Sequence, residues 1–223
     1  RQDIDSFFEN GELPADESIE PNGFVIGKAD QQSFLAVNKQ GVLQKLRHKM
    51  DGLINVEPRN SEQRFAIEAL LDPQIPLVTL TGLAGSGKTF LALMAGLHGL
   101  KTKQHGSMAN ALPEEFKTGF DRLVITRTLQ PVGRDLGYLP GTLEDKMQPW
   151  LMPILDNVRH AFKDISYFKM MMEAGEIEVA PIPYIRGRTF NDSFVIVDEA
   201  QNATIHELKT IITRMGTGSK IVL

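Results

Sequence analysis

The chain has 223 residues, of which 42% are hydrophobic and 23% charged, and its formal net charge is −4. This composition is typical of a globular protein with a substantial core. The acidic balance excludes a general electrostatic attraction to nucleic acid, so binding of that kind requires a local basic patch. The cysteine count is zero, which excludes disulfides and thiol chemistry. The sequence contains no signal peptide and no apolar run of about 18 residues, so we expect a cytoplasmic protein without membrane contact.

The first quarter of the chain differs in composition from the rest. Residues 1–22 are polar and acidic, which predicts a linker or a loosely ordered arm. Two short apolar runs, 24–27 and 33–37, predict a pair of strands joined by a polar turn. We therefore divide the chain into a linker arm with a small β element over 1–57 and a larger domain over 58–223. The first residue is not methionine, so we expect the chain to begin inside a longer protein.

Strands and helices alternate through the larger domain. Helices are predicted at 61–71, at 90–97, from about 142, ahead of Gly175 and from 205, and strands at 77–81, 122–126, 176–180, 193–197 and 219–223. The run 193–197 is apolar throughout, as expected of a strand covered on both faces, whereas 176–180 alternates as an edge strand does. This order predicts an α/β fold with a mostly parallel sheet flanked by helices. We expect its C-terminal part to be truncated, because the last strand ends at the last residue.

Two further segments of this domain are distinctive. Thr204 and Glu207 form a capping-box pattern, and the helix that they start is expected to carry its apolar residues on one face. These residues are Ile205, Leu208, Ile211, Ile212 and Met215. The segment 101–121 has poor periodicity, which favours a surface insertion without catalytic importance, although a connection of this length can also be functional or mobile.

The most informative motif lies between a predicted strand and a predicted helix. Its sequence, Gly82-Leu83-Ala84-Gly85-Ser86-Gly87-Lys88-Thr89, matches the phosphate-binding pattern G-x-x-x-x-G-K-T. Glycines allow the backbone N–H groups to curl around an anion, and the following helix presents its positive end to the same phosphates. Lys88 is expected to reach the β- and γ-phosphates of ATP, and the Thr89 hydroxyl to bind Mg²⁺. Phe90, the next residue, is counted among the cofactor-binding positions.

A pair of acidic residues follows the apolar strand 193–197. Asp198 and Glu199 stand at its C-terminal end, where ligands bind in open α/β sheets. Asp198 is expected to hold Mg²⁺, and Glu199 to orient or deprotonate the attacking water. Two adjacent acids are also common in solvated turns, but the apolar strand in front of them favours the catalytic interpretation.

Several other side chains are candidates on weaker patterns. Arg186 and Arg188 form the most conspicuous basic cluster, which suits a transferring phosphoryl group or a nucleic-acid backbone. The alternative is that each arginine pairs with an acidic neighbour for structural reasons. Further members of the same class are Arg127, Arg134 and Arg214. The amide of Gln63 offers one donor edge and one acceptor edge, which suits adenine, although an ordinary surface glutamine has the same pattern.

An ordered set of motifs resembles the PhoH-like ATPase family. The motifs occupy 58–63, 82–89, 131–133, 137–141, 185–189, 197–202, 213–216 and 218–220. The resemblance runs from residue 58 to the end and implies a P-loop NTPase fold similar to the motor core of superfamily-one helicases. It implies that Gln63 contacts adenine. It also assigns the family's nucleotide and metal roles to Lys88, Thr89, Asp198 and Glu199, in agreement with the chemistry of these residues.

The resemblance also implies partners. Longer relatives carry an N-terminal PIN ribonuclease domain and unwind RNA, so we expect an ATP-hydrolysing motor that acts on single-stranded RNA as a homo-oligomeric ring, such as a hexamer. The alternative is a nucleotide-regulated binding or signalling module of the phosphate-starvation type, which the acidic charge favours. The sequence departs from the family at Thr128, where proline is usual. It also stops at Leu223, where the family continues into a Gly-Asp-x-x-Gln segment that senses the γ-phosphate. We therefore expect ATP binding with poor hydrolysis.

Overall fold

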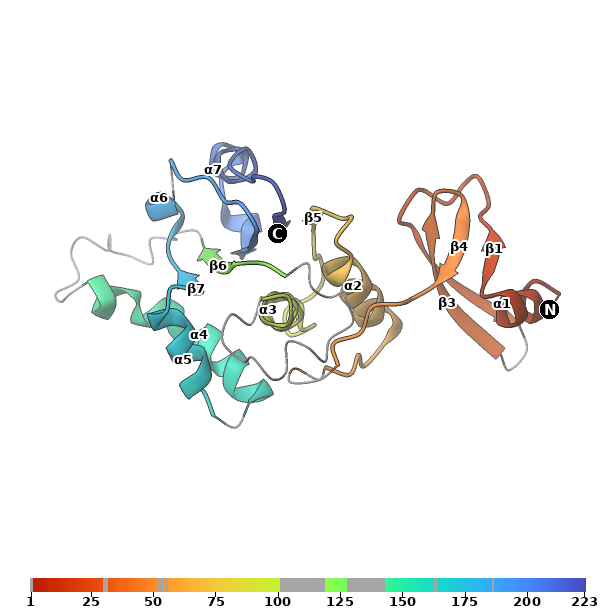
Figure 1. Cartoon of the computed structure of the whole chain (residues 1–223), viewed down its shortest axis with the longest axis horizontal. Helices are drawn as coiled ribbons and strands as arrows, with labels where there is room; N and C mark the ends of the chain where they lie inside the picture. The colour runs from red at the N-terminus through yellow and green to blue at the C-terminus, as the bar shows by residue number, and fades with distance from the viewer. Residues whose placement is uncertain are drawn as a thin grey trace. The chain divides into compact units, whose positions relative to one another are not determined.

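The computed structural model describes residues 2–29, 32–51, 54, 56–100, 119–127, 143–162, 164–185 and 187–223. The chain forms two compact units (Figure 1). The first unit consists of Arg1–Lys49 and Glu57–Ala69, and the second of Met50–Val56 and Leu70–Leu223. Several predicted features lie outside the described residues: Arg186, Thr128, Arg134, the motifs 131–133 and 137–141, and the part 101–118 of the segment 101–121.

The first unit is an antiparallel sheet with a helix packed against it. Its elements are α1 (Gln2–Asn10), β1 (Glu12–Pro14), β2 (Phe24–Ala29), β3 (Gln32–Lys39) and β4 (Val42–Lys45), and the strand order is β1-β4-β3-β2. Helix α1 corrects the expectation of a loosely ordered arm. Its Ile4 and Phe7 are buried, and the Phe7 ring stacks on Phe34 with the centroids 3.9 Å apart. Apolar residues three positions apart give this short helix a face that the sheet covers. The predicted strands are confirmed as β2 and β3.

A buried carboxylate joins helix α2 (Ser61–Leu71), which coincides with the predicted helix, to the segment after β4 within the first unit. Glu68 is 3% exposed and accepts hydrogen bonds from the backbone N–H groups of Arg47 and His48, at 3.1 and 3.0 Å. The Nδ1 atom of His48 lies 2.9 Å from Glu68 Oε1. Burial opposes ionisation of Glu68, but these contacts outweigh it and hold the pKa of Glu68 below its ordinary value. The ionised carboxylate therefore fixes this corner of the unit.

The second unit contains a parallel five-stranded sheet in the order β5-β9-β8-β6-β7 (Figure 1). The strands are β5 (Leu77–Val78), β6 (Arg122–Arg127), β7 (Ile177–Val179), β8 (Ser193–Asp198) and β9 (Lys220–Val222). The helices are α3 (Lys88–His98), α4 (Leu143–Ala161), α5 (Ser166–Glu173), α6 (Ile182–Ile185), the 3-10 turn η3 (Ala200–Asn202) and α7 (Ile205–Ile212). The predicted α/β class and parallel sheet are confirmed, with β8 central and β7 at an edge.

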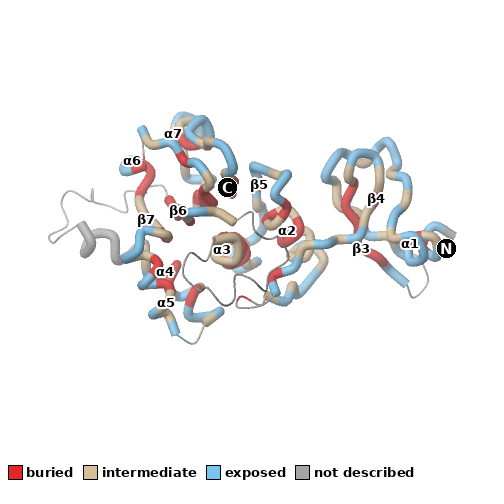
Figure 2. The backbone as a smooth tube through the Cα atoms, in the orientation of Figure 1, coloured by how far each residue is buried: buried red, intermediate tan, exposed pale blue. Residues whose placement is uncertain are grey.

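Both faces of this sheet are covered, because residues 123–126 of β6 and 193–197 of β8 are buried (Figure 2 colours the backbone by burial). On one face α3 lies so close that a Cβ on Gly96 would be 2.7 Å from Leu123 and 3.0 Å from Phe194. The opposite face packs against α6 and α7. That layer is made of Val124, Val195, Val197 and Ile221 from the strands, Ile182 and Ile185 from α6, Phe190, and Ile211 from α7. The central strand is therefore apolar up to the residue at which it ends.

Helix α7 has the predicted cap and apolar face, but only part of that face is buried. Thr204 Oγ1 accepts a hydrogen bond from the N–H of Glu207 at 3.2 Å, and Glu207 Oε2 accepts one from the N–H of Thr204 at 2.9 Å. Ile211 is buried, whereas Ile205 is 85% exposed and Ile212 is 38% exposed. With 3.6 residues per turn, Ile205, Leu208, Ile211 and Ile212 lie on one side of the helix, as predicted. The core covers only the part of this face at Leu208 and Ile211, and Ile205 and Ile212 lie on its exposed part.

Candidate active site

The predicted phosphate loop lies between β5 and α3, at the carboxyl end of the parallel strands. Gly85 and Gly87 have φ angles of 77° and 89°, a region in which other L-residues are strained. Gly87 is the N-cap of α3, so the loop turns directly into the helix. Residues 82–86 are exposed. The loop therefore presents backbone N–H groups and the positive end of a helix at an open surface, which is the arrangement that binds phosphate.

The lysine of the loop folds back over it. Lys88 Nζ donates hydrogen bonds to the carbonyl oxygens of Gly82 and Leu83, at 2.8 and 3.0 Å. Both acceptors belong to the loop itself, so the ammonium group lies where an anion held by the loop would meet it. Exchange of these carbonyls for phosphate oxygens needs only a side-chain movement, because a lysine is a point charge on a flexible stem.

The loop meets the central strand through one hydrogen bond. Thr89 Oγ1 donates to Asp198 Oδ1 at 2.8 Å, although the two residues are 109 positions apart in the sequence. The Asp198 side chain is 16% exposed, so it is held in place at the end of β8. A hydroxyl and a carboxylate are hard oxygen ligands of the kind that Mg²⁺ prefers, and Mg²⁺ commonly uses one or two protein oxygens with phosphates and waters. These two residues therefore fit the metal role that the sequence predicts for them.

Glu199 stands next to Asp198 in a strained conformation. Its φ and ψ are 52° and 42°, the left-handed region that non-glycine residues seldom adopt, and it caps the turn η3. Gln201 Nε2 donates a short hydrogen bond to Glu199 Oε2. The Glu199 side chain is 41% exposed. Local strain of this kind costs about 1–3 kcal/mol and is common at functional sites, where it aims a side chain.

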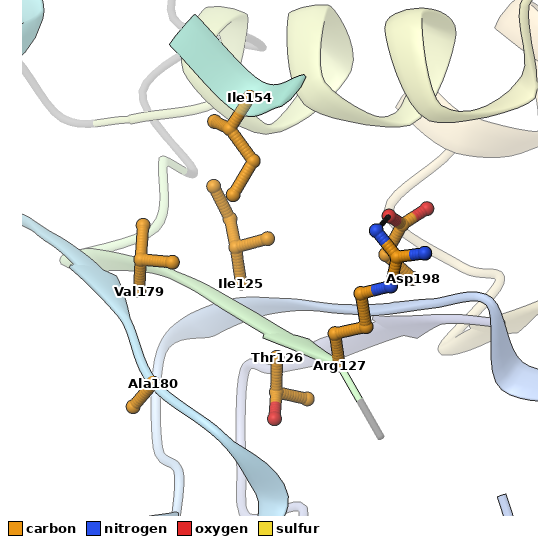
Figure 3. A pocket seen from close by; sticks show the side chains of 7 residues that line it. All are labelled: Ile125, Thr126, Arg127, Ile154, Val179, Ala180 and Asp198. Atoms are coloured by element: carbon orange, nitrogen blue, oxygen red, sulfur yellow. Dashed lines mark ion pairs between the residues drawn. The ribbon is translucent and has the colours of Figure 1, made fainter. Parts of the chain in front are cut away.

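An arginine from the neighbouring strand lies beside both acids. Arg127 ends β6, and its Nη1 and Nη2 atoms are 3.9 Å from Asp198 Oδ2 and from Glu199 Oε1 respectively. It also lines a small hollow at this edge of the sheet (Figure 3). The other lining residues are Ile125, Thr126, Ile154, Val179, Ala180 and Asp198. From the sequence, Arg127 was a weaker arginine candidate in the same class as Arg134 and Arg214. Its position directly after the predicted strand 122–126, at the carboxyl end of that strand, was the available signal.

The other predicted arginines lie elsewhere or are not described. Arg188 makes two hydrogen bonds to Glu178 on the edge strand β7, one of them at 2.7 Å, and these lower the pKa of Glu178. The backbone carbonyl of Arg214 accepts the N–H of Phe190, ahead of β8 and thus at the opposite edge of the sheet from Asp198. Arg188 therefore has the acidic partner expected if its role is structural rather than catalytic. Its catalytic role, like that of Arg186, stays a prediction.

Two further cofactor-binding predictions have local partners. The N–H of Gln63 donates to Asn60 Oδ1 at 2.8 Å, and Gln63 Oε1 accepts the N–H of Arg59 at 2.8 Å, so Gln63 helps to start α2. The Phe90 ring meets His160 of α4 edge-on, with the centroids 5.6 Å apart. Adenine contact by Gln63 and a cofactor role for Phe90 both stay predictions.

The described residues contain neither a cluster of metal-ligating side chains nor a membrane-spanning helix. No group of three or more His, Cys, Asp or Glu side chains among them could hold a metal ion. None of the helices in the described parts of the chain is long and apolar enough to cross a membrane.

Comparison with known proteins agrees with the motifs. The profile of the family described as PhoH-like protein matches residues 55–223. Protein PhoH2 of Bacillus subtilis is 43% identical over 211 residues, which cover 91% of this chain and 45% of that protein. Protein PhoH2 of Mycolicibacterium smegmatis is 34% identical over 226 residues, with 100% and 48% covered, and a PhoH-like protein of Mycobacterium tuberculosis is 38% identical over 168 residues, with 75% and 43% covered. The chain thus spans about half the length of these relatives.

Proposed function

Because the chain belongs to the PhoH-like protein family, we propose that it binds ATP together with Mg²⁺ and hydrolyses the γ-phosphate. Membership indicates a nucleotide-binding domain of the ATPase type. The observation that carries the proposal is the 2.8 Å hydrogen bond between Thr89 and Asp198. It joins the phosphate loop to the acidic end of the central strand, and these are the two parts that a Mg²⁺–nucleotide complex needs side by side.

The binding step uses the loop and its lysine. The N–H groups of residues 82–89 and the start of α3 would hold the β-phosphate, and Lys88 Nζ would leave the carbonyls of Gly82 and Leu83 for phosphate oxygens. Thr89 and Asp198 are the residues that would hold Mg²⁺. Bound Mg²⁺ neutralises the charge of the β- and γ-phosphates.

The hydrolytic step uses Glu199. Its half-exposed carboxylate stands beside Asp198, and the strained backbone together with the hydrogen bond from Gln201 fixes its direction. A carboxylate held in this way can orient a water molecule and accept its proton as the water attacks the γ-phosphorus. Arg186 and Arg188 remain candidates for stabilising the developing charge, and Gln63 for contacting adenine.

We extend the proposal to RNA remodelling by a homo-oligomeric ring in the cytoplasm, alongside a PIN ribonuclease domain of a longer protein. Its support is the resemblance of the ordered motifs to superfamily-one motor cores. The alternative is a nucleotide-regulated binding or signalling module without helicase activity. The formal charge of −4 favours that alternative, because it gives no general attraction to an RNA backbone.

Hydrolysis assays on the protein in its full natural length distinguish these functions. We expect Mg²⁺-dependent ATP hydrolysis that falls about 100-fold or more in Glu199→Gln, while ATP binding is retained. Glu173→Gln, which changes an exposed acid on α5, is the matched control and should leave the rate unchanged. Stimulation by single-stranded RNA supports the motor, and hydrolysis without stimulation supports the module. A Glu199→Gln rate equal to the wild-type rate would contradict the catalytic assignment.

A further inference from the structure

A guanidinium group lies between the two carboxylates of the candidate site. Arg127 directs one nitrogen to Asp198 and the other to Glu199, each 3.9 Å from a carboxylate oxygen (Figure 3 shows the pair with Asp198). Arg127 and Asp198 are direct partners in the parallel register of β6 and β8. The strand pairing, rather than a chance meeting of long side chains, therefore places this arginine opposite the acids.

The contact is an ion pair without close hydrogen bonds. Charge-assisted hydrogen bonds between nitrogen and oxygen measure about 2.7–2.9 Å, and these separations are longer. The Arg127 side chain is 38% exposed, and ion pairs open to water cost little to separate. The other oxygen of Asp198 accepts the Thr89 hydroxyl at 2.8 Å. Asp198 is thus shared between Thr89, a residue suited to binding Mg²⁺, and a loosely held cation.

Lys88 and Arg188, two other candidate cations of the site, have other partners. Lys88 Nζ is on the loop carbonyls of Gly82 and Leu83, and Arg188 is on Glu178. Within the described ranges, the ion pairs of Asp198 and Glu199 are both with Arg127. Arg127 therefore offsets the repulsion of two adjacent negative charges.

We propose that Arg127 is an exchangeable counter-ion of this carboxylate pair, which Mg²⁺–nucleotide must displace from Asp198. The inference rests on the proposed nucleotide site. A divalent cation between Thr89 and Asp198 would bring two positive charges against the guanidinium, and both would compete for the same carboxylate. Arg127 is then a positioning residue that sets the Mg²⁺ concentration at which the site loads. It keeps the acids neutralised when metal is scarce and raises the Mg²⁺ concentration that is needed to displace it from Asp198.

The test measures nucleotide affinity over a series of Mg²⁺ concentrations, with a fluorescent ADP analogue as the probe. Arg127→Gln removes the charge but keeps a polar side chain, and Arg127→Lys keeps the charge. Arg122→Gln is the matched control, because Arg122 begins the same strand and lies 4.0 Å from Glu178 in a similarly loose ion pair. Thermal unfolding checks that all the variants are folded. We expect Arg127→Gln to lower the half-saturating Mg²⁺ concentration about two- to fivefold, the size of an exposed ion pair, and the other two variants to leave it unchanged.

The outcomes separate the two proposals. A half-saturating Mg²⁺ concentration that stays the same or rises in Arg127→Gln, while the wild type binds the analogue, overturns the counter-ion role alone. Absence of binding by the wild type at every Mg²⁺ concentration overturns the proposed function and this inference with it. Affinity in EDTA must not rise in Arg127→Gln, since the arginine charge favours a metal-free nucleotide. A rise in EDTA would mean that the variant acts on the phosphates and not on the metal, which also overturns the counter-ion role.

Discussion

The carboxyl ends and the amino ends of the parallel strands form two edges of the sheet, here called the carboxyl edge and the amino edge. These two edges are held together in different ways. At the carboxyl edge, side chains meet side chains: Thr89 with Asp198, Arg127 with both acids, and Gln201 with Glu199. At the amino edge, backbone meets backbone. The N–H of Gly216 donates to the carbonyl of Phe190 at 2.6 Å, and the N–H of Phe190 donates to the carbonyl of Arg214 at 2.9 Å, across the segments that precede β8 and β9. A ligand can replace side-chain contacts without unfolding the chain, whereas it cannot replace backbone ones.

Glycines serve both edges for different reasons. At the amino edge they permit close approach, because a Cβ on Gly218 would lie 2.2 Å from Asp192 Oδ1 and one on Gly216 would lie 3.0 Å from the carbonyl of Phe190. In the phosphate loop, a Cβ on Gly85 would have no neighbour within 4 Å. The loop glycines are needed for the path of the backbone around an anion, and the others for packing. We therefore expect substitutions at the carboxyl edge to change ligand affinity and those at the amino edge to change stability.

The largest expected effect is the loss of nucleotide affinity in Lys88→Met. Removal of a charge-assisted hydrogen bond to phosphate should weaken ATP binding about 100-fold, or about 2.7 kcal/mol, without lowering the melting temperature. Isothermal titration with Mg²⁺–ATP measures it. Lys209→Met, which changes an exposed lysine of α7, is the control and should bind as the wild type does. Equal affinities of the two variants for Mg²⁺–ATP would contradict a phosphate-binding role of Lys88 at the carboxyl edge.

The amino edge predicts a stability effect in Gly218→Ala. Gly218 and Gly175 have similar φ angles of 69° and 73°, but a Cβ on Gly175 would have nothing within 4 Å. Both substitutions carry left-handed strain of about 1 kcal/mol. Only Gly218→Ala adds a clash, with Asp192, and we expect it to lower the free energy of unfolding by about 2 kcal/mol in total. Urea unfolding of the two variants measures the difference. Similar losses would mean that the close approach contributes nothing.

A buried lysine of β9 gives a smaller effect of the same kind. Lys220 is 2% exposed, and its Nζ donates to the carbonyls of Leu70 and Asp72 at 2.9 and 2.7 Å, around the end of α2. Lys220→Met should leave these carbonyls without that donor and lower the free energy of unfolding by about 1–2 kcal/mol. The nucleotide affinity of the folded variant should not change. Urea unfolding measures the free energy of unfolding, and isothermal titration with Mg²⁺–ATP measures the affinity. A loss of nucleotide affinity without a loss of stability would contradict the assignment of Lys220 to the structural, amino edge of the sheet.

The smallest effect concerns pH and the edge strand. Hydrogen bonding from Arg188 lowers the pKa of Glu178 below its ordinary value of 4.5. Since the folded-state pKa is depressed, the stabilisation is present above the ordinary pKa and is lost as the pH falls through the folded value. In this partly exposed pair it should amount to less than about 1 kcal/mol. Urea unfolding between neutral and acid pH should show that the free energy of unfolding depends less on pH in Arg188→Gln than in the wild type. Arg159→Gln is the control, because Arg159 forms an exposed ion pair with Asp156. A large loss of hydrolysis in Arg188→Gln with unchanged stability would instead support a catalytic arginine.

What the sequence predicts well is local. The phosphate loop, the capping box at Thr204 and the buried strand 193–197 each depend on neighbours within a few residues, and all three are found where predicted. Among contacts between distant residues, the pairing of Thr89 with Asp198 followed from their shared Mg²⁺ role, whereas contacts without such a motif were not predictable. Helix α1 forms because Phe34 and the rest of the first sheet cover Ile4 and Phe7. Arg127 meets the acids only because β6 pairs with β8 in a particular register. The exposure of Ile205 likewise depends on how far α7 is covered, which periodicity alone does not define.

Hydrogen–deuterium exchange with and without Mg²⁺–ATP tests, in one measurement, whether the nucleotide binds at the carboxyl edge of the sheet and leaves the amino edge unchanged. We expect slower exchange at residues 82–89 and 198–201 when the nucleotide complex binds, and no change at 190–192 and 214–219, where the backbone hydrogen bonds are already made. Protection confined to 190–192 and 214–219, or no protection in either region at saturating Mg²⁺–ATP, would contradict a nucleotide site at the carboxyl edge of this sheet.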